Sequence, residues 1–375
     1  IIEETKVFCK TLEQHAKNNN IFRLEEVMTK LSIDVIGQLI LDTRLHFQTE
    51  KNILGEAIVS QIDWIPQGRL DKPWEGLNPA FPLVMLWNNW KMDNYISRIL
   101  EERFAAHDKF KGKARNVMDL ALEGYRGTEQ KAPPQMDRQF KKNAICQVKT
   151  FLFAGHDTVS GTLAYTFHLL SKSPDKMAKI REEHDRVFGS NPDDAEELIR
   201  SKPVLLNKLE YTLAVIKETL RLYPPASTMR AGHKGLFIRD PKTGKSWPTE
   251  HFMVSPTTIG MHRHADLFPQ PHKFLPERFL EKGSYPGYLP FSKGPRSCIG
   301  QDLAIIESKV ILVLTLRKFN IRACYEGLRS LRGDGSSWPG EENGVQEVWG
   351  DEAYQVMQGF AKPREGLPAR VSLRN

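Results

Sequence analysis

The feature that most constrains the fold is a long helical pattern that runs from about Met136 to Ser171 and ends before Pro174. Its middle, residues 150–154 and 162–170, is almost wholly apolar on every side of the helix. A helix at the surface of a protein keeps a polar face, whereas one that is apolar all round belongs in the centre of a large core. We therefore expect the rest of the chain to fold around this segment.

The remaining patterns predict a mainly α fold with a minor β part. We expect one domain over residues 1–375, with a helical part at about 1–225 and a β-containing part at about 226–375. Helical spacing favours further helices at residues 24–41, 87–106, 174–189, 206–222 and 299–316. Loop-like or strand-like composition is found at residues 76–86 (loop), 109–134 (polar connection), 236–238 and 252–254 (short strands), and 317–375 (strands and loops).

Composition excludes several classes of protein. No run approaches the roughly 18 apolar residues of a membrane span, and the first ten residues do not resemble a signal peptide. Four scattered cysteines are too few for a disulfide framework, so we expect a reduced, intracellular protein. The net charge of +7 comes without basic segments interleaved with aromatics, so a nucleic-acid partner is not expected. A solvated basic surface explains the charge as well as a binding partner does.

A ten-residue segment, Phe291 to Gly300, carries the strongest chemical signal. Its cysteine, Cys298, comes directly before a predicted helix, whose N-terminal amides stabilise a thiolate. The flanking glycines let the backbone turn tightly and approach a bulky planar ligand, and Arg296 can neutralise a carboxylate of that ligand. A lone cysteine in this position is more often a small buried apolar side chain. The surrounding residues change that balance and indicate a thiolate ligand for haem iron.

This segment resembles the haem-binding loop of the cytochromes P-450, the haem-thiolate monooxygenases, and the resemblance extends from about residue 25 to the end of the chain. It implies that Cys298 is the proximal ligand of the iron of haem b and that Arg296 contacts a haem propionate. Phe291 and Gly300 would complete the loop around the cofactor. The implied fold places the haem between the long central helix and the cysteine loop with the final helix.

Glu218 and Arg221 lie three residues apart in a predicted helix, so their side chains share a face and can pair. Taken alone, such a pair is usually a surface ion pair that contributes about 0–1 kcal/mol. In the family, this pair joins the arginine of a later Pro-Glu-Arg-Phe motif, here Arg278, and locks the segment behind the cysteine loop. The resemblance therefore implies a structural role for all three residues, since buried charges need mutual satisfaction.

The string from Ala154 to Thr158 places polar residues inside the apolar central helix. The Thr158 hydroxyl can reach the Ala154 carbonyl and open the helix there, Gly155 leaves room for a small ligand, and Asp157 supplies a carboxylate for proton delivery. A polar kink without function explains the string equally well. The string resembles the oxygen-activation segment of the family, which implies that Asp157 and Thr158 relay protons while Ala154 and Gly155 border the cofactor. His156 fills a variable position and is expected to be a polar group of the helix rather than an iron ligand.

Three weaker signals follow the same resemblance. Arg230 stands where the family often has another propionate-binding arginine, and His262 begins a His-Arg dipeptide for which haem contact and structure have equal weight. The stretch 74–90, rich in Pro, Trp and Leu, corresponds to the substrate-access region. It is either ordinary helix packing or a surface that enters a lipid interface.

The resemblance implies a monooxygenase that inserts one atom of O2 into a hydrophobic small molecule, a secondary metabolite or lipid. Its electrons would come from NADPH through an NADPH–cytochrome P-450 reductase. The tail at residues 350–355 and 362–363 resembles fungal members of the family. We expect an intracellular monomer that, if full-length, is located at the cytosolic face of the endoplasmic reticulum membrane. The N-terminal part of a typical member, with its anchor, is expected to be absent. The alternative hypothesis is therefore a truncated, non-catalytic remnant.

Overall fold

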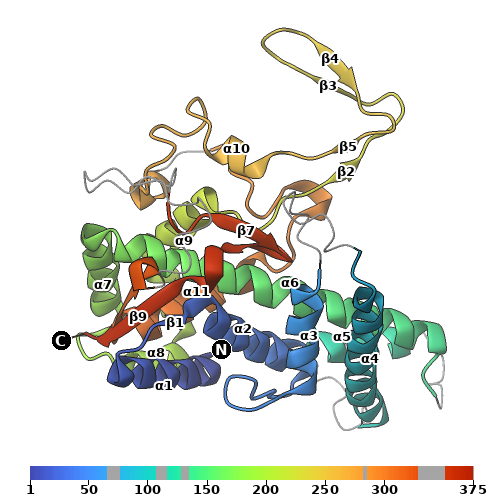
Figure 1. The fold of residues 1–375 in the computed structure, drawn as a ribbon, viewed down its shortest axis with the longest axis horizontal. Helices are drawn as coiled ribbons and strands as arrows, with labels where there is room; N and C mark the ends of the chain where they lie inside the picture. Colours follow the sequence, from blue (N-terminus) through green and yellow to red (C-terminus); the bar gives the residue numbers. More distant parts are fainter. Residues whose placement is uncertain (66–76, 107–115, 128–134, 282–284, 328–350, 375) are drawn as a thin grey trace.

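A computed structural model describes residues 1–65, 77–106, 116–127, 135–281, 285–327 and 351–374. Its central element is helix α6, Arg138–Ser171, which crosses the molecule in Figure 1. The helix begins after Asp137, whose carboxylate accepts a hydrogen bond from the amide of Phe140 at 2.8 Å. Every residue from Val159 to Leu170 is buried. The predicted core helix is therefore confirmed.

The other helices confirm the mainly α class. The first part of the chain forms α1 (Ile2–Asn18), α2 (Leu24–Leu41), α3 (Ile53–Asp63), α4 (Ala80–Ala106) and α5 (Val117–Gly127). The part after α6 forms α7 (Pro174–Phe188), α8 (Asp194–Ser201), α9 (Glu210–Leu222), α10 (Thr258–His262) and α11 (Gln301–Leu316). Short 3₁₀ turns include η3 (Pro203–Lys208), η4 (Pro276–Phe279), η5 (Gly294–Arg296), η6 (Tyr325–Gly327) and η8 (Arg364–Gly366).

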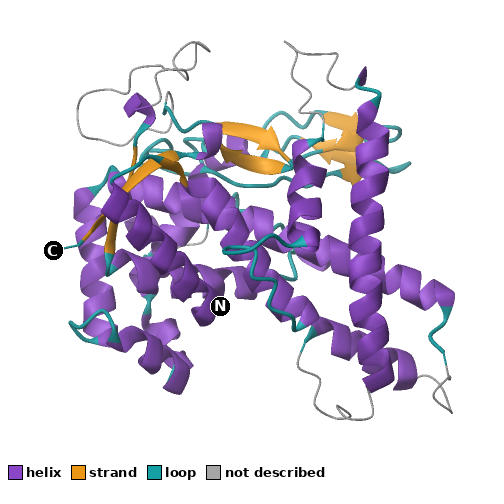
Figure 2. Cartoon of the chain, turned by 60° about the horizontal axis from the view of Figure 1, so that its bottom comes forward, coloured by secondary structure: helices purple, strands orange, loops and turns teal. Residues whose placement is uncertain are grey.

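The strands are short and pair antiparallel. They are β1 (Phe22–Arg23), β2 (Arg230–Ala231), β3 (Phe237–Arg239), β4 (Ser246–Pro248), β5 (Met253–Val254), β6 (Phe319–Ala323), β7 (Gln355–Gln358), β8 (Phe360–Pro363) and β9 (Pro368–Leu373). Strands β1, β9 and β6 form one sheet, and the other pairs are β2–β5, β3–β4 and β7–β8. Figure 1 shows the β3–β4 hairpin projecting from the body, and Figure 2 shows β strands lying to one side of the helices.

Two predicted loops are partly helical. Helix α4 begins at Ala80, inside the expected loop, because Pro82 is tolerated in the first turn of a helix, where its missing N–H has no intrahelical role. Helix α5 lies inside the expected polar connection. The parts of the predicted segments at 74–76, 109–115, 128–134, 328–350 and residue 375 lie outside the described residues.

The packing of α6 sets the position of the site. Its second half joins α1, α2, α9, α11 and the β1–β9–β6 sheet in one hydrophobic cluster, and its first half joins α2, α3, α4 and α5 in another. The side of α6 near residues 154–162 borders a cavity instead of a fully packed core. In the part of the chain that is described, no helix combines the length and apolar character needed to span a bilayer.

Candidate functional site

The cysteine loop holds a free thiol at the N-terminus of α11. The Cys298 amide donates to the Phe291 carbonyl at 2.9 Å, and the Ser297 amide donates to the Gly294 carbonyl at 2.9 Å. Gly294 has a φ of 79°, a conformation that favours glycine. The Cys298 side chain is exposed and forms no disulfide. The backbone thus fixes the direction of the loop while the sulfur remains available as a ligand.

A cavity of about 230 Å³ lies between this loop and α6. From α6 it is lined by Ala154, Thr158, Val159 and Thr162, and from the loop by Phe291, Arg296 and Cys298. Apolar side chains supply most of the remaining wall; these include Ile216, Leu220, Leu289, Ala304, Ile305 and Phe360. The structure therefore brings together Ala154, Thr158, Phe291, Arg296 and Cys298, which the sequence predicted from two distant motifs.

Thr158 forms the predicted hydrogen bond. Its hydroxyl donates to the Ala154 carbonyl at 2.8 Å. Thr162, one turn later, donates in the same way to the Thr158 carbonyl at 2.7 Å. Two adjacent hydroxyl side chains thus stand on the face of α6 that borders the cavity, although α6 remains a continuous helix through this point. Thr162 follows from the four-residue spacing, and sequence reasoning missed it.

Asp157 and Gly155 do not line the cavity. The Asp157 carboxylate is fully buried and pairs with the Lys362 ammonium at 2.6 Å. A Cβ added to Gly155 would lie 2.7 Å from the Ile36 side chain, so this glycine permits close packing of α2 on α6. The expectation that Gly155 leaves room for a ligand is therefore corrected. The proton-relay role of Asp157 stays a prediction, and in this structure its carboxylate does not line the cavity.

His262 is a structural tie and does not border the cavity. Its ring is fully buried; Nδ1 donates to the Arg221 carbonyl at 3.1 Å, and Nε2 accepts from the Leu289 amide at 2.9 Å. Both ring nitrogens are thus engaged by backbone groups. Burial lowers the pKa of His262 from 6.5 to about 4, so the ring is neutral near pH 7. Of the two roles weighed for His262, these contacts supply the structural one, and cofactor contact stays a prediction.

The Glu218 cluster forms as the motifs implied. Arg221 meets both Glu218 carboxylate oxygens at 2.8 Å, and Arg278 approaches the same carboxylate at 3.1 Å. The remaining Arg221 donors reach the carbonyls of His262 and Pro271, both at 2.7 Å. All the charged partners are at least 90% buried. This arrangement fixes the chain between α9 and the cysteine loop.

Two other predicted residues lie apart from the cavity. Arg230 is exposed on β2, and its guanidinium donates to the neighbouring Met229 carbonyl at 2.9 Å. His156 is fully buried in α6, where Nδ1 donates to the Leu152 carbonyl at 2.7 Å and burial lowers its pKa. Arg230 as a propionate ligand therefore stays a prediction, and His156 behaves as the expected polar group of the helix.

Two functional candidates escaped sequence reasoning because they come from the distant β7–β8 hairpin. Phe360 lines the cavity, with its ring centroid 5.0 Å from that of Phe153. The Lys362 ammonium forms the ion pair with the Asp157 carboxylate. Phe360 belongs to no motif, and residues 362–363 carry only a resemblance to fungal members of the family. Only the three-dimensional position of the hairpin relates the two side chains to the site.

The residues of the cavity fit a haem in their chemistry. Within the described ranges, no three His, Cys, Asp or Glu side chains gather as a metal site. A single thiolate is a complete protein contribution when a porphyrin supplies the other iron ligands. The walls are mostly apolar, as a porphyrin face requires, and Arg296 places a cation in the same lining. A Cβ at Gly300 would lie 3.9 Å from the Cys298 sulfur, which places Gly300 beside the thiol.

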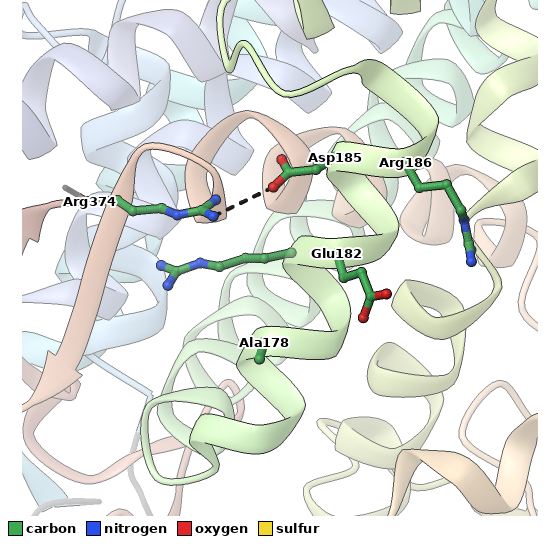
Figure 3. Close-up of a pocket in the computed structure, with 6 residues that line it drawn as sticks. Ala178, Glu182, Asp185, Arg186 and Arg374 are labelled. Atoms are coloured by element: carbon green, nitrogen blue, oxygen red, sulfur yellow. Dashed lines mark ion pairs between the residues drawn. The ribbon is translucent and has the colours of Figure 1, made fainter.

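Another hollow, of about 560 Å³, lies on the outer surface of α7. Figure 3 shows Arg374 directed toward Asp185, with a distance of 3.5 Å between them, while Glu182 and Arg186 extend away from that pair. Ala178 and Arg181 complete the lining, which contains no thiol, hydroxyl or imidazole group. We therefore place the candidate site at Cys298.

Comparisons with known proteins concern the family and the fold of the chain. The family model for cytochrome P-450 matches residues 1–332. The chain is 35% identical over 381 residues to the cytochrome P-450 monooxygenase polC of Polytolypa hystricis, covering 100% of this chain and 67% of that protein. It is 37% identical over 396 residues to the cytochrome P-450 monooxygenase acrF of Aspergillus aculeatus, covering 99% and 77%. A crystal structure of a cytochrome P-450 matches the whole chain and 77% of its own length with a TM-score of 0.73 at 21% identity, which supports the fold alone.

Proposed function

Because the chain belongs to the cytochrome P-450 family of monooxygenases, we propose that it inserts one atom of O2 into a hydrophobic small molecule of a fungal secondary-metabolite or lipid pathway. The observation that carries this proposal is the free thiol of Cys298 in an apolar cavity, facing the hydroxyl-bearing side of α6. The two fungal relatives support the assignment to fungal metabolism.

In this proposal the haem-binding residues come from the cysteine loop. The Cys298 thiolate holds the iron, Arg296 neutralises a propionate, and Phe291 and Gly300 shape the space beside the sulfur. Arg230, on the neighbouring β2 strand, is proposed as a further propionate partner. When bound, haem b supplies the activation of O2 and the transfer of oxygen.

The wall formed by α6 is proposed to exclude water and to deliver protons. Ala154 keeps the helix surface small beside the cofactor, and the apolar wall excludes water from the reacting substrate. The Thr158 hydroxyl is the proposed proton donor at the cavity, since a hydroxyl passes a proton on while it accepts another. Asp157 is the proposed source of that proton and would have to leave Lys362 to reach it.

The proposed electron donor is an NADPH–cytochrome P-450 reductase, and the proposed location is the cytosolic face of the endoplasmic reticulum. Helix α4 and Leu77, three residues upstream of it, offer a surface for a membrane: Leu77, Leu83, Leu86, Trp87 and Trp90 are exposed. The rings of Trp87 and Trp90 stack at 4.8 Å. Tryptophan prefers the headgroup region of a bilayer. A blue shift of tryptophan emission on adding phosphatidylcholine vesicles would test this surface.

The function is tested by product analysis with labelled oxygen. The haem-loaded chain is incubated with a reductase, NADPH, ¹⁸O₂ and a panel of apolar terpenoid and fatty-acid substrates. Transfer of one ¹⁸O atom to a product, lost in Cys298→Ala, would support the proposal. Haem binding without NADPH oxidation or labelled product would instead support the non-catalytic remnant.

A further inference from the structure

The β7–β8 hairpin borders both the cavity at Cys298 and a charged region beside α2 and α3. Phe360, near the turn, lines the cavity, whereas Lys362 borders a separate space of about 820 Å³ between α2, α3 and the hairpin. Gly359 makes the turn with a φ of 76°, and a Cβ there would lie 3.0 Å from the Asp157 carboxylate. The tip of the hairpin therefore presses closely on α6.

Asp157 holds this tip at two points. One carboxylate oxygen pairs with the Lys362 ammonium at 2.6 Å, and the other accepts the Phe360 amide at 3.1 Å. The same ammonium lies 3.1 Å from Glu25 on α2. These contacts join side chains that are all at least 90% buried, where ion pairs are only weakly screened by water.

The cluster is held by one cation shared between two anions. Burial opposes the charge of Lys362, but Glu25 and Asp157 outweigh burial and raise its pKa, so the ammonium stays charged near pH 7. Thr29 supports Glu25 with a hydrogen bond of 2.8 Å. Without the ammonium, two buried carboxylates would face each other, an arrangement that folded proteins avoid. The hairpin position therefore depends on Lys362.

We propose that Lys362 is a positioning residue that fixes the depth of Phe360 in the Cys298 cavity and thereby sets the size of ligand that the cavity accepts. The ligand part of this inference rests on the proposed function. The anchoring part concerns contacts within the chain and does not depend on haem.

Hydrogen exchange measured by mass spectrometry tests the anchor without haem. In Lys362→Met the amides of residues 355–363 are expected to exchange about tenfold faster, because the hairpin loses its ion pairs with Asp157 and Glu25 and keeps only the hydrogen bond from the Phe360 amide. Lys362→Arg should restore the original rate, since arginine keeps the charge. Lys30→Met is the matched control: Lys30 is an exposed lysine that borders the same space. An unchanged rate in Lys362→Met would overturn the proposal.

A milder variant covers the case in which Lys362→Met does not fold. Glu25→Gln removes one of the two anions but leaves the Lys362–Asp157 pair and an oxygen that can accept from Thr29. The exchange rate of residues 355–363 should then stay within about threefold of the original. A rise as large as that expected for Lys362→Met would show that Lys362 acts through Glu25 on α2, and it would overturn the anchoring role of Asp157.

Optical titration of the haem-loaded chain tests the effect on ligand size. The probes are imidazole and the larger 4-phenylimidazole, which share the imidazole ring and differ in size. Lys362→Met should raise the dissociation constant of 4-phenylimidazole about tenfold and leave that of imidazole unchanged. Lys362→Arg should bring the dissociation constant of 4-phenylimidazole back to its original value. An unchanged ratio of the two dissociation constants would contradict the proposal. If the original chain takes up no haem, the proposed function fails, and the exchange measurement alone decides the role of Lys362.

Discussion

Glu218 and Asp157 are both fully buried carboxylates behind a wall of the Cys298 cavity, and they are satisfied in different ways. Glu218 faces two guanidinium groups whose other donors reach backbone carbonyls. Asp157 faces the single ammonium of Lys362, which Glu25 shares. Arginine offers several donors in a rigid plane, whereas lysine is a point charge on a flexible stem.

Because of this difference, we expect the Glu218 cluster to be rigid and the Asp157 cluster to be adjustable. The Glu218 cluster holds the chain behind the cysteine loop in one geometry, because a change in any partner would leave a buried donor or acceptor unpaired. The Asp157 cluster can redistribute its one cation between two anions. We therefore expect the first cluster to determine stability and the second to influence the shape of the cavity.

The largest expected effect is that of Glu218→Gln. The substitution leaves Arg221 and Arg278 buried without a counter-charge, so the free energy of unfolding in urea should fall by about 3–5 kcal/mol. The matched control is Glu26→Gln. Glu26 pairs with Arg23 at the same three-residue spacing, but at 3.5 Å and in an exposed position, so its loss should cost about 0–1 kcal/mol. Equal losses in the two variants would contradict the contrast.

The next effect is a pH dependence from His262, whose ring donates to the Arg221 carbonyl. Its pKa is about 4 in the folded chain against 6.5 otherwise. Between these values the unfolded chain binds a proton that the folded chain does not. The free energy of unfolding should therefore fall by about 3 kcal/mol from pH 7 to pH 4 because of this residue.

Urea unfolding at pH 7, 5.5 and 4 measures this contribution. His262→Gln should reduce the slope of stability against pH, while His251→Gln, at an exposed position, should leave it unchanged. The same slope in His262→Gln as in the original chain would show that His262 is not held neutral by its two backbone partners.

A smaller effect is expected for Asp157→Asn. The variant loses a charged hydrogen bond to Lys362, which retains Glu25 as its partner, so the free energy of unfolding should fall by about 1.5–3 kcal/mol. Urea unfolding of Asp157→Asn and Glu218→Gln under the same conditions measures the two losses of free energy. A loss as large as that of Glu218→Gln would show that the Asp157 cluster is as rigid as the Glu218 cluster.

The smallest effect on stability, below about 1 kcal/mol, is expected for Thr158→Val, because the Ala154 carbonyl keeps its place in the helix. Thr150→Val is a matched control, since Thr150 makes the same bond to the Cys146 carbonyl at 2.9 Å on an exposed part of α6. With a reductase and NADPH, only Thr158→Val should divert several times more electrons to hydrogen peroxide. Equal diversion in both variants would remove Thr158 from the proton path.

The two clusters also differ in how far sequence could predict them. Glu218 and Arg221 are one helical turn apart, and Arg278 belongs to a recognisable motif, so local spacing and the family resemblance were sufficient. Asp157 and Phe360 are 203 residues apart. Helical periodicity placed Asp157 on α6 but could not show that its carboxylate turns away from the cavity. That direction depends on the hairpin packed against it.

Two other residues depend on distant packing in the same way. Gly155 was predicted to make room for a ligand, yet the neighbour that requires a glycine is Ile36 on α2. His262 had two equally weighted roles, and the backbone groups that supply the structural one belong to Arg221 and Leu289. Residue type and spacing identify candidates, whereas packing between distant elements decides which face each candidate takes.

The central claim is that Cys298 supplies a thiolate to haem iron in the cavity beside α6. The most direct test is the absorbance spectrum of the haem-reconstituted chain after reduction and exposure to carbon monoxide. We expect the red-shifted Soret band typical of thiolate ligation in the original chain and in Cys146→Ala, which removes another exposed free cysteine, and its loss in Cys298→Ala. A band typical of a neutral ligand, or one that persists in Cys298→Ala, would contradict the claim.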